Sequence, residues 1–178
     1  MSRKVKIILS AAVLLISVGA VIWWRVASRE DKVVGSPLEK IHIHAIFHVY
    51  VDDRLQDFSG LEYMNIKPCS EEPEVYDPAD EQYEKAHLHD YVGEVVHVHR
   101  AGAMWGDLFT NIGVRLASPS VAYVDGIEVA DIMNTEIKAD SRVLILVGEY
   151  GNPESKLEAL PTIDLIREVE NNSESCGD

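Results

Sequence analysis

The histidines of this chain are concentrated in three short segments, and their spacing is typical of metal ligands. All 7 histidines lie within Ile41–Val51, at His87 and His89, or at His97 and His99. Within the first segment the odd positions are apolar, and histidine stands at positions 42, 44 and 48. Because a β-strand turns successive side chains to opposite faces, each His-x-His unit presents two imidazoles to one side. This pattern predicts a metal site.

The ligands that these units offer are all nitrogen atoms, with no cysteine close by in the sequence. Such a set suits zinc, copper(II) or nickel, and we expect zinc or copper as the cofactor. The candidate ligands are, in order of preference, the residues of one hairpin, His87, His89, His97 and His99, then His42 and His44, and last His48. Asp90 and Glu94 are candidate oxygen donors. The alternative interpretation is a polar or pH-responsive histidine face that holds no metal.

The second and third His-x-His units predict a β-hairpin over residues 86–101. A three-residue loop, Tyr91–Gly93, with Gly93 in the left-handed conformation, would pair His87 with His97. A two-residue loop would instead put the two units on opposite faces. Directly paired residues have Cβ atoms about 5 Å apart, which is a distance that two imidazoles can bridge with one ion.

The rest of the chain predicts the elements that must hold these histidines in place. Ile41–Val51 and Leu55–Phe58 form a first hairpin around the turn Asp52-Asp53. Residues 60–85 form an acidic, proline-broken loop that ends in a short helix over about 78–85. The later elements are a helix over 102–116, a hairpin over 121–129 with an Asp-Gly turn, a buried strand over 143–147 and an amphipathic helix over 162–170.

This order of hairpin, helix, hairpin and strand resembles a β-grasp (ubiquitin-like) domain over roughly residues 86–150. The segments that carry the resemblance are 121–129 and 137–145, which are similar to the closing strands of small sulfur-carrier proteins and of ligand-binding β-grasp domains. The chain ends in Cys176-Gly177-Asp178 and lacks the terminal Gly-Gly of sulfur carriers, so that chemistry is not implied. The expected fold class is α+β, a β-grasp-like mixed sheet with one packed helix plus an extra N-terminal hairpin, preceded by one transmembrane helix.

The N-terminal region predicts a membrane anchor. Between Lys6 and Arg25 lie 18 uncharged and mostly apolar residues, which is just enough for a helix to span a bilayer. Trp23 and Trp24 end the run, where aromatic rings favour the interface, and the basic residues before it favour a cytoplasmic N-terminus. We therefore expect an uncleaved single-pass anchor with the domain outside the cytoplasm; the alternative is a cleaved signal peptide.

Composition and charge limit the classes of function. The net charge is −14, with all 30 acidic residues beyond residue 29, so binding to nucleic acid is not expected. The predicted organisation is an anchor over 1–26, a linker over 27–40, a histidine-rich α+β domain over 41–150, and a short helix with a disordered polar tail over 151–178. Two cysteines, Cys69 and Cys176, either pair or stay as separate thiols.

Two classes of function follow from a metal site, and a third needs none. The first is a membrane-anchored domain that buffers, senses or delivers zinc or copper. The second is a metalloenzyme of the hydrolase or lyase type, in which Glu94 or Asp90 would act as the acid or base. The third is an anchored domain that binds an unidentified protein partner without metal. Four protein ligands favour storage, whereas three ligands and a water favour catalysis.

Overall fold

A computed structural model of the chain describes residues 39–65, 78–117 and 120–172. The predicted membrane segment over residues 1–26, most of the predicted linker and both cysteines lie outside these ranges. Among the helices that the structure describes, none combines the length and the apolar composition needed to cross a membrane.

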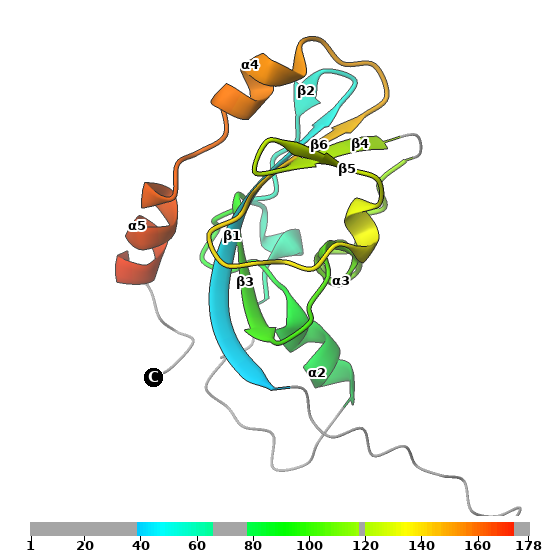
Figure 1. The fold of residues 1–178 in the computed structure, drawn as a ribbon. Helices are drawn as coiled ribbons and strands as arrows, with labels where there is room; N and C mark the ends of the chain where they lie inside the picture. Colours follow the sequence, from blue (N-terminus) through cyan, green and yellow to red (C-terminus); the bar gives the residue numbers. More distant parts are fainter. Residues whose placement is uncertain (1–38, 66–77, 118–119, 173–178) are drawn as a thin grey trace, which may run out of the picture. The chain divides into compact units, whose positions relative to one another are not determined.

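The described residues form an α+β fold around one curled, mixed sheet of 6 strands (Figure 1). The strand order is β2-β1-β6-β4-β5, and β3 also pairs with β1. The strands are β1 (Lys40–Val51), β2 (Arg54–Leu55), β3 (Val95–Arg100), β4 (Ser120–Val124), β5 (Ile127–Val129) and β6 (Arg142–Val147). β1 is parallel to β6 and antiparallel to β2 and β3, so it lies in the middle of the sheet.

Helices of modest length accompany this sheet. They are α2 (Pro78–Lys85), α3 (Trp105–Asn111), α4 (Pro153–Glu158) and α5 (Asp164–Asn172), with the 3₁₀ turns η1 (Leu61–Tyr63) and η2 (Ile132–Asn134). The predicted helix over 78–85 is confirmed. The predicted helix over 102–116 is shorter, because Gly102 and Gly113 adopt the left-handed conformation (φ 74° and 70°) on either side of α3. α4 was not predicted.

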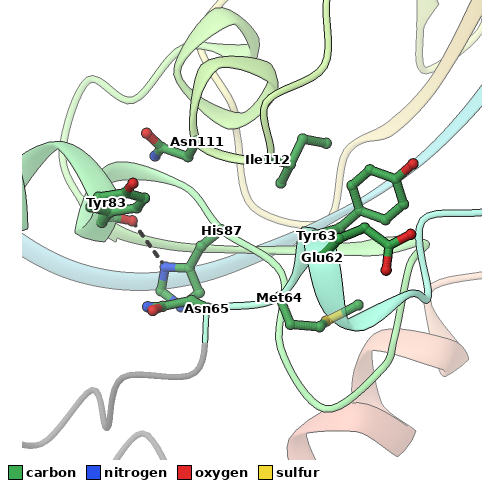
Figure 2. Close-up of a pocket in the computed structure, with 8 residues that line it drawn as sticks. All are labelled: Glu62, Tyr63, Met64, Asn65, Tyr83, His87, Asn111 and Ile112. Carbon is green, nitrogen blue, oxygen red and sulfur yellow. Dashed lines mark hydrogen bonds between the residues drawn. The ribbon is translucent and has the colours of Figure 1, made fainter.

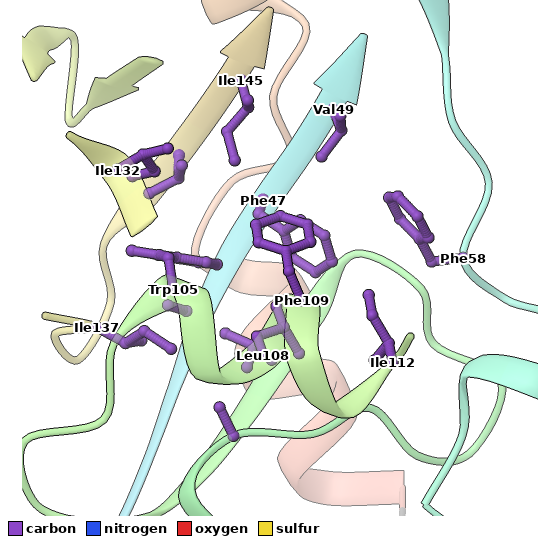
Figure 3. Packing of buried hydrophobic residues seen from close by; sticks show 14 of the residues in the cluster. Phe47, Val49, Phe58, Trp105, Leu108, Phe109, Ile112, Ile132, Ile137 and Ile145 are labelled. Carbon is purple, nitrogen blue, oxygen red and sulfur yellow. The ribbon is translucent and has the colours of Figure 1, made fainter. Parts of the chain in front are cut away.

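The main hydrophobic core lies between α3 and one face of the sheet (Figure 3). Phe47 and Val49, at odd positions of β1, point into this core, as the alternating pattern predicts. Trp105 and Phe109 of α3 pack on Phe47, with ring centroids 5.8 and 6.1 Å away. Each such side chain, once buried, contributes about 1.5–3 kcal/mol to folding. This face therefore provides most of the stability on which a site can be built.

The opposite face of the sheet is covered in part by α5. Ile166 and Val169, from the predicted apolar stripe of this helix, pack against Ile46 of β1 and Val95 of β3 in a second, smaller cluster. Because Ile46 occupies an even position of β1, α5 lies on the face that also carries the histidines. The C-terminal helix is thus part of the surroundings of the candidate site.

The predicted first hairpin is present, but its place in the fold differs from the expectation. Asp52 and Asp53 form the turn with positive φ, as predicted, and the return strand β2 is shorter than Leu55–Phe58. The sequence predicts this hairpin as an addition to the sheet, whereas β1 is in fact the central strand of the sheet. The reason is long-range: β6 lies parallel to β1 over Ile46–Val51, a pairing that no local pattern indicates.

Candidate metal centre

Neighbouring strands bring the histidines together on one side of the sheet, which we call the histidine face (His42, His44, His48, His87, His89, His97 and His99). In the register of β1 and β3, His44 lies directly opposite His97. His87 is paired with His97 on the other edge of β3 by an isolated antiparallel bridge. Three backbone segments that are far apart in the sequence therefore present imidazoles side by side.

The predicted pairing of His87 with His97 is confirmed, although the loop differs from the expected one. The backbone N–H of each residue donates to the carbonyl oxygen of the other at 2.9 Å. Asp90 and Tyr91, not Gly93, take the left-handed conformation (φ 55° and 61°). Gly93 is instead required by close approach, because a Cβ there would lie 2.5 Å from the backbone of Phe58 and Ser59.

His44, His89 and His97 form the tightest group, which we call the inner triad. The Nε2 atoms of His44 and His89 each lie 2.7 Å from Nδ1 of His97. All three side chains are buried, with exposed fractions of 4%, 7% and 2%. The Nε2 atoms of His44 and His89 thus both face Nδ1 of His97, in a site that is largely closed to solvent.

Carboxylates hold the outer nitrogens of two inner-triad histidines. Nδ1–H of His44 donates to Glu170 of α5 at 2.9 Å, and Nδ1–H of His89 donates to Asp90 at 2.6 Å. An ionised carboxylate only accepts hydrogen bonds, so in the neutral form of each imidazole the proton sits on Nδ1 and the lone pair on Nε2 points inward. This carboxylate–histidine arrangement is the usual one for metal-binding histidines.

His42, His97 and His99 form a second group, the outer triad, which shares His97 with the inner one. One ligand nitrogen from each of the three can be chosen so that all lie within 4.8 Å of one another. The rings of His42 and His99 stack with centroids 4.9 Å apart, and His87 stacks on the other side of His99 at 5.1 Å. His42 is exposed and His99 is half-buried, so this triad lies nearer to solvent.

Burial keeps the central imidazoles neutral. It lowers the pKa of His87 to about 4, with a further contribution from His89, while the backbone carbonyl of Tyr83 acts in the opposite direction. Burial likewise lowers the pKa of His99 to about 3 and holds that of His97 far below its usual range. Neutral imidazoles carry the lone pair that a metal ion needs.

The remaining predicted site residues belong to neither triad. His48 is separated from His44 by Ile46, and its Nε2–H donates to Glu94 at 2.5 Å. Glu94, a candidate oxygen donor, is therefore paired with His48, and Asp90 accepts from the outer nitrogen of His89. Glu170 was missed by the sequence analysis, because the apolar stripe predicts α5 but not the strand on which it packs.

Contacts between helices position His87 beside a cavity of about 400 Å³ (Figure 2). Nδ1–H of His87 donates to the carbonyl of Tyr83, at 3.2 Å, and Asn111 of α3 donates to the Ala86 carbonyl, at 2.8 Å. The cavity is lined by Glu62, Tyr63, Met64, Asn65, Tyr83, His87, Asn111 and Ile112. His87 is the lining residue that belongs to the histidine face.

Comparison with known proteins matches the chain to no protein-family model, no curated protein and no solved structure. The function is therefore argued from the geometry of the histidine face.

Proposed function

We propose that this protein is a membrane-anchored, extracytoplasmic domain that binds zinc or copper through its histidine face. The support for metal binding is the group of His42, His97 and His99, whose ligand atoms lie close enough to hold a metal ion. A chain that buries this many histidines together needs a reason, since each buried polar atom without a partner destabilises the fold by about 1–3 kcal/mol.

The inner triad is the single observation that carries the proposal. In the neutral form of His44 and His89, Glu170 and Asp90 keep the ring proton on Nδ1, so both Nε2 atoms are acceptors. Both face Nδ1 of His97, which has at most one proton to donate. One proton cannot make two good hydrogen bonds, so at least one pair of lone pairs repels at 2.7 Å. A cation at this point would turn all three lone pairs into ligands.

The chemistry of the ligands favours zinc or copper(II). Both ions bind neutral imidazole well, and the triads contain nitrogen donors only. Tetrahedral zinc, with Zn–N bonds of about 2.0–2.1 Å, keeps its ligand nitrogens about 3.3 Å apart, so the inner triad would open by roughly half an ångström. The acidic surface implied by the net charge of −14 attracts cations toward the domain.

The membrane anchor is proposed from the sequence of residues 1–26, with its basic start, its 18-residue uncharged run and its terminal tryptophans. An extracytoplasmic domain would meet metal ions arriving from outside the cell.

We also propose that the fold is β-grasp-like. The support is the order of an antiparallel strand pair (β1 and β3), a helix (α3), a hairpin (β4 and β5) and a final strand (β6) parallel to the first.

A metalloenzyme is the second candidate, favoured by two observations. Each triad supplies three protein nitrogens, which leaves a zinc ion one coordination position for water. The cavity beside His87 is large enough for a small substrate. A storage or delivery site would instead recruit a fourth protein ligand once loaded. X-ray absorption spectroscopy of the zinc-loaded protein separates the two, since a metal-bound water adds an oxygen to the nitrogen shell.

The test of metal binding uses the full chain, extracted from membranes and purified without a histidine tag. We expect at least about one zinc or copper per chain by elemental mass spectrometry. The His44→Gln/His89→Gln double variant should lose the ion that the inner triad binds. The control is His48→Gln, which replaces a buried histidine outside both triads and should keep that ion. A wild-type chain that binds neither metal, before or after titration with zinc and copper(II), would contradict the proposal.

A further inference from the structure

His97 occupies a special place on the histidine face because both triads depend on it. It lies on β3 between two other segments, opposite His44 on one side and His87 on the other. It belongs to the inner triad through Nδ1 and also to the outer triad with His42 and His99. With an exposed fraction of 2%, its ring is shut off from solvent.

The two ring nitrogens of His97 have different surroundings. Nδ1 has two neighbours, the Nε2 atoms of His44 and His89. Nε2 is buried and has no hydrogen-bond partner among the residues that the structure describes. The Nε2 atom of His99, also in the outer triad, is likewise buried without a partner. Buried polar atoms in native proteins are nearly always satisfied, so these two nitrogens indicate a missing ligand on the outer side.

Strand geometry separates the two triads along β3. Because His87 pairs with His97, His89 is displaced along the sheet in one direction, toward Val95. His42 and His99 are two residues removed from His44 and His97 in the opposite direction. A single ion bound between His44 and His89 would therefore leave His42 and His99 on the far side of the His97 ring.

We propose that the centre holds two divalent cations bridged by the imidazolate of His97. This inference rests on the proposed function and deepens it. Nδ1 of His97 binds the inner ion together with His44 and His89, and Nε2 binds the outer ion together with His42 and His99. On loading, His97 releases its one ring proton to solvent, so two dications enter and one proton leaves this residue. The bridging anion offsets part of the repulsion between the ions.

The number of ions tests the bridge first. The full-length chain is stripped with a chelator, titrated with zinc, freed of unbound ion and measured by elemental mass spectrometry. Wild type should retain two zinc ions per chain. His42→Gln/His99→Gln should retain one, and His48→Gln, the matched control, should retain two. A wild-type chain that saturates at one ion overturns the bridge but keeps the proposed function, whereas a chain that binds none overturns both.

Magnetic coupling tests whether the two ions share His97. In the protein loaded with two copper(II) ions, an imidazolate bridge couples the two unpaired electrons, so the low-temperature electron paramagnetic resonance signal should be mostly lost. His97→Gln should show only the signal of uncoupled copper. Two copper ions with full signal intensity in wild type overturn the bridge. Circular dichroism shows whether His97→Gln folds. If it does not, the wild-type spectrum and the His42→Gln/His99→Gln variant still test the bridge. That variant should show the full signal of one copper ion.

Discussion

The two faces of β1 show how one strand can serve stability and chemistry separately. Phe47 and Val49 point to the core, where the buried side chains are almost entirely hydrocarbon and the one unpaired polar atom among the described residues is Nε1 of Trp105. His44 and His48 point to the other face, where every buried ring brings nitrogen atoms that need partners. Burial alone therefore does not define a core, since His44 and His48 are nearly as closed to solvent as Phe47 and Val49 but carry polar atoms that need partners.

The histidine face holds three of the five buried side-chain nitrogens that lack a hydrogen-bond partner among the described residues, and the other two belong to Arg100 and Trp105. Within the described part of the chain, Nδ1 of His48, Nε2 of His97 and Nε2 of His99 are buried without a hydrogen-bond partner. Leaving such atoms unmatched costs about 1–3 kcal/mol each. A face that lowers stability in this way is the expected location of a ligand site, while the opposite face supplies the stability that tolerates it.

The largest effect is expected on the apolar face. Phe47→Ala removes a fully buried ring that contacts Trp105 and Phe109, and should lower the free energy of unfolding by about 3–5 kcal/mol. Urea unfolding followed by fluorescence measures it. Ile127→Ala, at an apolar residue that is 72% exposed, is the control and should change stability little. Equal effects of the two substitutions would contradict the assignment of this face as the core.

The second effect is a loss of stability in acid that comes from the histidine face. His87 has a pKa of about 4 in the folded protein and an ordinary value of 6.5 when unfolded, so the unfolded chain binds more protons between these values. Stability of the metal-free protein is therefore full above pH 6.5 and falls as the pH drops toward 4, by on the order of 3 kcal/mol from this residue.

Urea unfolding of the chelated protein at a series of pH values measures this loss. His87→Gln should make the pH dependence shallower over the same interval, because glutamine does not titrate, while the lowered pKa values of His97 and His99 maintain the rest of it. Phe47→Ala should lower stability at every pH by a similar amount. A wild-type protein as stable at pH 4 as at pH 7 would contradict the neutral, buried state of His87.

A third, smaller effect is expected from the carboxylate that orients His44. Glu170→Gln replaces a charged carboxylate, which only accepts, with a neutral amide that can also donate, so the proton of His44 is no longer held on Nδ1 and zinc binding should weaken about 10- to 100-fold. Competition with a fluorescent chelator measures the affinity. Glu168→Gln, on the exposed side of the same helix, carries the same change of charge and should bind zinc like wild type. Equal weakening by both would assign the effect to overall charge.

The smallest effect on metal binding is expected from His48→Gln. Although this side chain is on the histidine face, it is paired with Glu94 and lies beyond Ile46. Zinc affinity should change less than about twofold, which is below roughly 0.5 kcal/mol. The same competition assay measures it. A loss comparable to that of the inner-triad variants would show that the metal centre extends along β1 as far as His48.

Local patterns predicted much of the fold and part of the site. The alternation in β1, the Asp52-Asp53 and Asp125-Gly126 turns, the helix after Asp77 and the pairing of His87 with His97 follow from contacts between residues close in sequence. The role of Gly93 did not, because the backbone of Phe58 and Ser59 that it approaches comes from another segment.

The sequence by itself determined that the histidines of each His-x-His unit face one way, because strand stereochemistry depends only on neighbouring residues. It also determined their type, and hence the nitrogen ligands that any metal would meet. Only the tertiary structure decided that His44 lies against His97, since β1 had first to become the central strand beside β3 and β6. It alone brought Glu170 to His44, because which helix covers which face depends on packing over the whole domain.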